Sequence, residues 1–195
     1  ACLMQMAEVV TEIKDYAKFI VASQELIPGP GYPYDEILRA INQTSDIRKM
    51  AIAMVDAYHY AYNGGKYSPS KGTTLSVIDT SKFQEFINLL NRWVVTAISS
   101  KDFKIITSAP IVENAFFFEQ DEAMGYVLNE ETENILTRTA DLVSYLRNVY
   151  EVVDDEKIKK ETISLMEYIK NDLVVYHRGG NFQNHQRLSY ANDTY

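Results

Sequence analysis

The apolar residues at the start of the chain follow a helical pattern. Between residues 3 and 17 they stand three or four positions apart, which predicts a helix with one buried stripe that begins near Cys2. The next segment, residues 18–23, reads KFIVAS, and its Ile and Val indicate a short buried strand. A helix that leads directly into a strand is typical of an α/β layer.

A loop rich in proline and glycine separates this strand from two further helices. Residues 28–33, PGPGYP, contain three prolines and two glycines, a composition that excludes regular structure. Residues 35–41 then fit a short helix. Residues 46–62 fit a longer helix, which an Asn-Gly-Gly sequence closes because these residues tolerate positive φ angles.

A second strand and another helix follow. Residues 73–79, TTLSVID, are rich in β-branched residues and place Leu75 and Val77 on one side of a predicted strand. Ser81 and Gln84 have the spacing of a capping box, and apolar residues at helical spacing follow them. The sequence therefore predicts that a strand again meets a helix.

The pattern beyond about residue 101 is mostly helical. Residues 139–150 and 155–176 each carry an apolar stripe, and the second segment stops before a Gly-Gly pair. One last short strand is expected at about residues 188–190.

Composition and charge narrow the function classes. Acidic residues outnumber basic ones, 27 to 19, and the net charge of -8 argues against a nucleic acid bound through its phosphates. The sequence has no run of about 20 apolar residues, so no transmembrane helix is predicted. A chain of 195 residues with one cysteine forms no internal disulfide, and one compact domain is the expectation.

Cys2 is the main candidate for chemistry. A thiolate at a helix N-terminus is stabilised by unpaired backbone N–H groups and by the helix dipole, a position that suits a nucleophile. The alternative is that Cys2 is a small buried apolar residue. No pair of Cys or His residues has the spacing of metal ligands, and no glycine-rich phosphate loop occurs.

A cysteine nucleophile ordinarily needs a base within hydrogen-bond reach, usually a histidine. The chain offers His59, His177 and His185. His59 lies among tyrosines on a predicted helix, His177 lies near a helix end, and His185 belongs to a polar tail. None of them has an evident mechanistic setting, which favours a base that lies outside this chain.

Four stretches of the sequence resemble the clostripain family of cysteine peptidases. They are ACLM, FIVASQE, PGPGYPYDEIL and TLSVIDTSK, and their order and spacing agree with the family over residues 1–82. Further on, ADLVSYL and RLSY are similar to later segments of that family.

The resemblance implies a fold and a division of the chain. The expected fold is a caspase-like α/β sandwich, a central sheet flanked by helices, of which this chain forms the C-terminal part with additional helices. Residues 1–100 would form the C-terminal part of the catalytic domain, and residues 101–195 a mainly helical C-terminal region of the same domain.

The resemblance also implies an activity and its residues. It implies a hydrolase, a thiol endopeptidase that cleaves after Arg or Lys by a Cys-His dyad and a thioester intermediate, with Cys2 as the nucleophile. Ser23, Gln24 and Glu25 follow the first strand and are expected to line the substrate pocket. Glu25 would pair with the basic P1 side chain, or it is an ordinary loop carboxylate.

The expected partners follow from what the sequence lacks. The family's histidine stands in a His-Gly pair before the cysteine, and no His-Gly pair occurs here. An N-terminal light chain of the same precursor, separated by autoprocessing, is expected to supply it, which makes this chain the heavy chain or part of one. No cofactor is expected except calcium, which the resemblance makes possible. The resemblance also implies a bacterial protein that is secreted, periplasmic or on the cell surface.

Two other hypotheses remain open from the sequence. The chain could be a catalytically inactive relative, a binding or adhesion domain that keeps the fold without the dyad. It could also be a mostly helical structural domain with an incidental cysteine, in which case Cys2→Ala changes no activity.

Overall fold

The computed structural model describes residues 2–24, 27–68, 73–108 and 141–180. Backbone contacts divide the chain into two compact units. The first comprises Ala1–Phe83 and Asn171–Tyr195, and the second comprises Gln84–Lys170. The expected division at residue 100, between two parts of one catalytic domain, stays a prediction.

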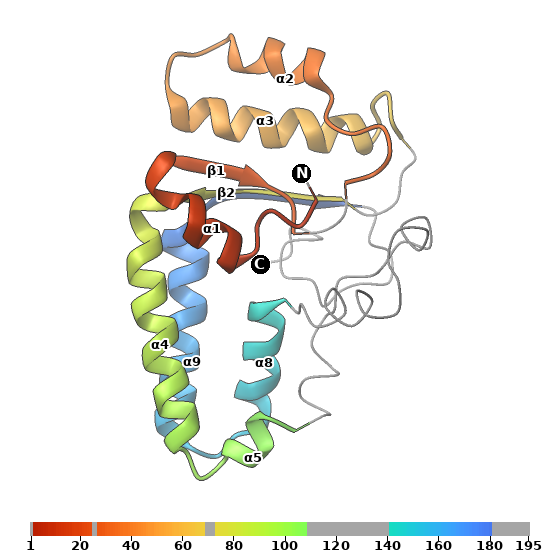
Figure 1. Ribbon diagram of the computed structural model, residues 1–195. Helices are drawn as coiled ribbons and strands as arrows, with labels where there is room; N and C mark the ends of the chain where they lie inside the picture. The colour runs from red at the N-terminus through yellow and green to blue at the C-terminus, as the bar shows by residue number, and fades with distance from the viewer. Residues whose placement is uncertain (1, 25–26, 69–72, 109–140, 181–195) are drawn as a thin grey trace, which may run out of the picture. The chain divides into compact units, whose positions relative to one another are not determined.

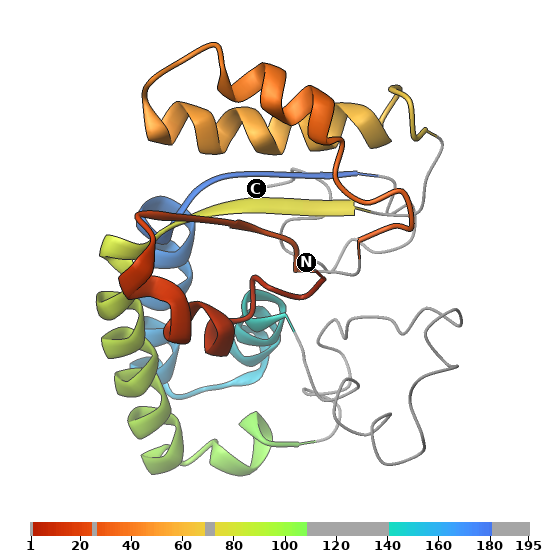
Figure 2. The same ribbon diagram turned by 45° about the horizontal axis from the view of Figure 1, so that its top comes forward.

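The described part of the first unit contains a three-stranded antiparallel sheet with the order β1-β2-β3. The strands are β1 (Phe19–Ala22), β2 (Thr73–Asp79) and β3 (Val174–Gly180). Strands were predicted at 18–23 and 73–79, and both are confirmed. The three strands lie side by side in Figure 2.

The third strand corrects the helix predicted over residues 155–176. Helix α9 (Glu156–Tyr168) runs on through a π-helical turn (Ile169–Leu173), and the chain then enters β3. The segment Val174-Val175-Tyr176 is β-branched and aromatic, and such residues fit a pleated strand better than a helix. The predicted strand at 188–190 lies outside the described residues.

Two helices lie on one side of this sheet, and the outer one packs on the inner one (Figure 1). They are α2 (Tyr34–Ile41) and α3 (Ile47–Tyr62), and α3 contacts all three strands. Asp46 caps α3 by accepting hydrogen bonds from the backbone N–H groups of Arg48 and Lys49 at 2.9 and 3.2 Å. The helices predicted over 35–41 and 46–62 are thus confirmed.

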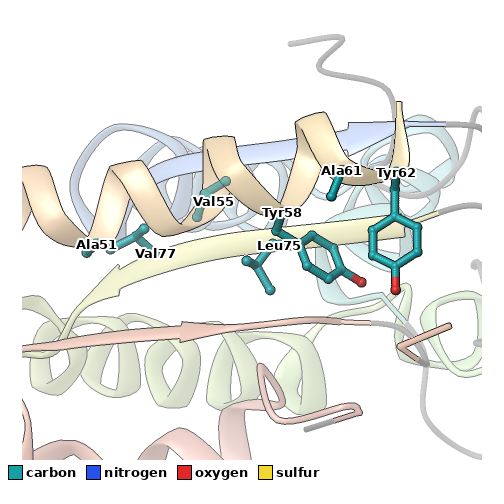
Figure 3. Packing of buried hydrophobic residues seen from close by; sticks show 7 residues of the cluster. All are labelled: Ala51, Val55, Tyr58, Ala61, Tyr62, Leu75 and Val77. Carbon is teal, nitrogen blue, oxygen red and sulfur yellow. The ribbon is translucent and has the colours of Figure 1, made fainter. Parts of the chain in front are cut away.

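The core of the first unit lies between α3 and β2, as Figure 3 shows. Its members are small or aromatic on the helix and aliphatic on the strand, namely Ala51, Val55, Tyr58, Ala61, Tyr62, Leu75 and Val77. Leu75 and Val77 share one face of β2, as the alternation predicted. The opposite face carries Thr74 and Ser76, which are also buried.

The first helix begins later than predicted. Helix α1 spans Ala7–Ile13 with Met6 as its N-cap, so Cys2 lies before the helix and not at its N-terminus. Residues 2–5 form a turn in which Leu3 has a φ of 57°. That left-handed conformation is incompatible with a right-handed helix, which accounts for the late start. In Figure 1, α1 lies on the side of the sheet opposite to α2 and α3.

The described part of the second unit is helical. Its helices are α4 (Phe83–Ser99), α5 (Phe103–Ile106), α8 (Leu142–Val152) and α9. The buried indole N–H of Trp93 on α4 donates to Thr162 Oγ1 on α9 at 2.8 Å. None of the helices that the structure describes is long and apolar enough to cross a bilayer.

Two helix starts in this region differ in their capping. Asp141 caps α8 by accepting from Ser144 N at 2.7 Å, and this helix confirms the one predicted over 139–150. The capping box predicted at Ser81 is wrong. Asp79 instead accepts from Ser81 N at 2.9 Å and caps a 3-10 turn (Thr80–Lys82) that precedes α4.

Two buried tyrosines on α3 provide a matched test of the core. The Tyr62 hydroxyl donates to Gly31 O at 2.7 Å, whereas the Tyr58 hydroxyl has no hydrogen-bond partner among the described residues. Tyr62→Phe is expected to lower the free energy of unfolding by about 1 kcal/mol, and Tyr58→Phe to leave it unchanged or raise it. Urea unfolding of both variants measures this difference. Equal losses in the two variants would contradict it.

Candidate active site

Cys2 lies on the turn that precedes α1, beside the loop that follows β1. Its Sγ accepts a hydrogen bond from the backbone N–H of Ile27 at 3.2 Å, and the side chain is partly buried. The prediction that Cys2 lies at a helix N-terminus, where the helix dipole would stabilise its thiolate, is therefore wrong. A backbone N–H of the loop after β1 contacts the sulfur instead. The next residue is Leu3, whose left-handed backbone is the kind of strained conformation that clusters at functional sites.

Gln5 attaches this turn to the sheet. Its backbone N–H donates to Ser23 O at 3.1 Å. Its side-chain amide donates to Ser76 O at 3.1 Å and to Ser76 Oγ at 2.9 Å. The polar face of β2 and the end of β1 thus hold the segment that carries Cys2.

The expected substrate-binding residues lie next to this attachment. Ser23 is fully buried, and its hydroxyl hydrogen-bonds to that of Thr74 at 3.1 Å. The backbone N–H of Gln24 donates to the same Thr74 oxygen at 3.2 Å. Glu25 lies outside the described residues. Ser23 and Gln24 therefore fix the end of β1 close to the Cys2 turn, and their substrate contacts stay a prediction.

A hollow of about 640 Å³ opens beside the sulfur. Apart from Asp35, the residues around Cys2 in its lining are aromatic, aliphatic or glycine, namely Ile27, Pro30, Gly31, Tyr32, Tyr34 and Tyr67. The sequence had predicted only a loop without regular structure over residues 28–33. The structure brings that loop to Cys2, and the aromatic residues of the loop were the signal available in the sequence.

The three tyrosines that line the hollow belong to a longer row of tyrosine rings. Successive ring centroids lie 6.1, 5.4, 5.0 and 5.2 Å apart in the order Tyr34, Tyr32, Tyr58, Tyr62, Tyr67. All four pairs are tilted, an arrangement that aromatic rings prefer to direct stacking. Figure 3 shows that the rings of Tyr58 and Tyr62 project from α3 on the side of β2. The row joins the loop after β1 to the turn after α3.

Two tyrosine hydroxyls of this row are uncharged at neutral pH. Burial, with smaller contributions from Tyr34 and Cys2, raises the pKa of Tyr32 to about 12. Burial also raises the pKa of Tyr58, and the charges of Tyr62, Tyr32 and Cys2 act in the same direction. Both hydroxyls therefore keep their protons.

The model of the clostripain family, Peptidase_C11, matches residues 1–192 of this chain. The chain belongs to the clostripain family. No match was found among curated proteins.

Solved structures of clostripain-family proteins share the fold. A secreted C11 cysteine protease from Bacteroides thetaiotaomicron in complex with an irreversible peptide inhibitor is 18% identical, with a TM-score of 0.58 over 92% of this chain and 43% of that one. An inactive zymogen C11 protease from Parabacteroides distasonis is 16% identical, with a TM-score of 0.58 over 92% and 42%.

A third clostripain-family structure matches over a larger share of its own chain. It is a clostripain from Bacteroides thetaiotaomicron in complex with the peptide inhibitor BTN-VLTK-AOMK, 16% identical, with a TM-score of 0.53 over 92% of this chain and 65% of that one. This chain spans less than half the length of the first two structures. These structural matches confirm the expected caspase-like α/β fold.

The histidines do not complete a clostripain-family dyad in the described part of the chain. The only hydrogen bond to Cys2 Sγ there comes from a backbone N–H. His59 lies on α3, with Nδ1 3.3 Å from the amide of Asn63, and His177 lies on β3 opposite Ser76. His185 lies outside the described residues.

Metal ligands do not gather in the described residues either. No group of three or more His, Cys, Asp or Glu side chains there could hold a metal ion. Calcium binding stays an expectation from the resemblance to the clostripain family alone.

The attachment through Gln5 has a measurable energetic consequence. Gln5→Ala removes the two side-chain hydrogen bonds to Ser76 and is expected to lower the free energy of unfolding by about 1 kcal/mol. Gln43→Ala is the matched control, because the Gln43 amide makes one exposed contact with Arg39 O. Its effect should stay within about 0.5 kcal/mol. Urea unfolding would contradict the attachment if both variants lost the same stability.

Proposed function

We propose that this chain is the nucleophile-bearing part of a cysteine endopeptidase that cleaves after Arg or Lys. The observation that carries the proposal is the position of Cys2. It lies on a strained turn and lines a hollow, in a chain that matches the clostripain family from residue 1 to residue 192.

The chemistry of the proposed reaction divides into two steps. The Cys2 sulfur attacks the carbonyl carbon of the scissile peptide bond, and a histidine takes the thiol proton and gives it to the leaving amine. Water then attacks the thioester, releases the carboxylate product and restores the thiol. Backbone N–H groups near the sulfur would stabilise the oxyanion of each tetrahedral intermediate.

The histidine belongs to a separate N-terminal light chain in this proposal. Two features support this: no histidine of the described residues hydrogen-bonds to Cys2, and the sequence has no His-Gly pair. A related structure is described as an inactive zymogen, which fits a precursor activated by its own cleavage. Two related structures are described as secreted proteases of Bacteroides, which supports an exported bacterial enzyme.

The basic specificity rests on Glu25 and on the relatives. Glu25 follows Gln24 in the sequence, and a carboxylate at this position would pair with an ammonium or guanidinium group of the substrate. The peptide inhibitor bound to the related clostripain, VLTK, ends in lysine.

Covalent labelling tests the nucleophile. An arginyl chloromethyl ketone is expected to alkylate Cys2 in the protease assembled with its light chain, and mass spectrometry of the digested chain locates the adduct. Cys2→Ala should abolish the label, and a glutamyl chloromethyl ketone should not react. An adduct on any other residue would overturn the assignment, and an unreactive Cys2 would favour an inactive binding or adhesion domain.

Substitution of Glu25 tests the specificity. Glu25→Gln removes the charge that would pair with Arg or Lys, so kcat/KM for such substrates should fall by about tenfold or more. Glu12→Gln is the matched control, because it removes the charge of an exposed glutamate on α1. A kcat/KM for an arginyl peptide that is unchanged in Glu25→Gln would refute this role.

A further inference from the structure

The hollow beside Cys2 differs in chemistry from a pocket for a basic side chain. Its lining is mostly apolar, and three of its residues are tyrosines. Its volume of about 640 Å³ lies within the range of about 300–1,000 Å³ that ligand pockets span. Because Cys2 itself is part of the lining, a peptide bound at the sulfur could extend one of its side chains into this space.

The walls of the hollow are held in place before any peptide binds. Tyr62 donates its hydroxyl to Gly31 O, which fixes the loop, and Gly31 has a φ of 73° that few residues other than glycine adopt. Tyr32 packs against the buried Tyr58 with a centroid distance of 5.4 Å. Tyr67 packs against Tyr62 at 5.2 Å. A preformed pocket loses less conformational entropy on binding than a mobile one.

Asp35 is the one carboxylate among the described residues of the lining, and it is paired with a lysine. Lys66 Nζ hydrogen-bonds to Asp35 at 2.5 Å and lies 4.9 Å from the centre of the Tyr67 ring. This hydrogen bond holds the pKa of the Asp35 carboxyl below its usual value, so the pair is ionised at neutral pH. The charges of Lys66 and Asp35 offset each other, so the described part of the hollow has no net charge with which to select an ion.

We propose that this hollow is a second specificity subsite, which takes an apolar or aromatic side chain that flanks the basic residue at the scissile bond. Tyr32, Tyr34 and Tyr67 are its specificity-determining residues, and the Lys66–Asp35 pair keeps it neutral. The inference rests on the proposed function, because it concerns the peptide that Cys2 cleaves.

Aromatic walls favour such an occupant for a physical reason. A ring or branched aliphatic side chain that leaves water for this hollow gains about 25 cal/mol for each Å² of apolar surface that it buries. A ring gains further from tilted contacts with Tyr32 and Tyr67. A glycine gains nothing, and a charged side chain loses hydration without finding an unpaired partner.

Internally quenched peptides test the subsite on the protease assembled with its light chain. Arg is fixed at the cleaved position, and the residue before or after it is varied among Gly, Leu, Phe, Lys and Glu. At one of the two positions kcat/KM for Phe or Leu should exceed that for Gly, Lys or Glu by about tenfold or more. Equal rates at both positions, or a preference for Lys, would overturn the proposal.

Substitutions in the wall identify the residues responsible. Tyr32→Ala and Tyr67→Ala should remove the preference for Phe over Gly while the Gly peptide is still cleaved. Tyr34→Ala carries little risk of misfolding, because this side chain is 68% exposed, and it should weaken the preference. The matched control is Tyr16→Ala, which removes a tyrosine that is 88% exposed and outside the hollow. A preference that survives in all three wall variants would refute the assignment.

Removing the charge of Lys66 tests the subsite independently of the tyrosines. If the tyrosines had only a structural role, this change would not alter the preference between charged and apolar side chains. Lys66→Gln leaves Asp35 without its lysine, so the ratio of kcat/KM for Lys to that for Leu at the selected position should rise by about fivefold. The double substitution Asp35→Asn with Lys66→Gln restores a neutral hollow and should return the ratio to that of the wild type. An unchanged ratio in Lys66→Gln would contradict the role of the pair.

The two proposals fail in different ways. If the wild-type protease cleaves none of the Arg peptides, the proposed function fails and the subsite fails with it. If the wild type cleaves them all at one rate, the proposed function stands and only the subsite is refuted.

Discussion

The polar face of β2 is the constraint on which the candidate site depends. One face of this strand carries Leu75 and Val77, which pack against α3 in the core. The other carries Thr74 and Ser76, whose buried hydroxyls bind the end of β1 and the side chain of Gln5. Buried hydroxyls are costly unless they are hydrogen-bonded, so these contacts stabilise one position of the two segments that meet at Cys2.

The aromatic row is the second part of this arrangement. Tyr58 and Tyr62 are fully buried on α3, and each supports a ring that reaches the hollow. The helix that fills the core therefore also shapes the surface beside the sulfur. Substitutions in this core would for this reason affect both stability and substrate preference, whereas the exposed Tyr34 can be changed with little effect on the core.

Much of the first unit could be predicted from local patterns. The alternation in β2 and the apolar spacing of α3 were sufficient, because each element buries one face. The start of α1 could not be predicted, since it depends on the left-handed backbone of Leu3, a residue that rarely adopts it. Strand β3 was missed because its apolar residues also fit the spacing of the preceding helix.

The candidate site was predictable in part. Cys2 and the loop after β1 carry the family's motifs, and the family match bears out that resemblance. The hollow was not predictable, because its tyrosines come from a loop, a helix and a turn that only the tertiary fold brings together. The pairing of Lys66 with Asp35 spans 31 positions of the sequence, so no local pattern signals it.

The most direct test of this account is a crystal structure of the assembled protease after reaction with a phenylalanyl-arginyl chloromethyl ketone. The account predicts a thioether at Cys2 Sγ and the turn of Cys2 still bound to Ser76 through Gln5. A covalent bond to another atom, or a Cys2 turn detached from β2, would contradict the claim that the polar face of this strand positions the nucleophile.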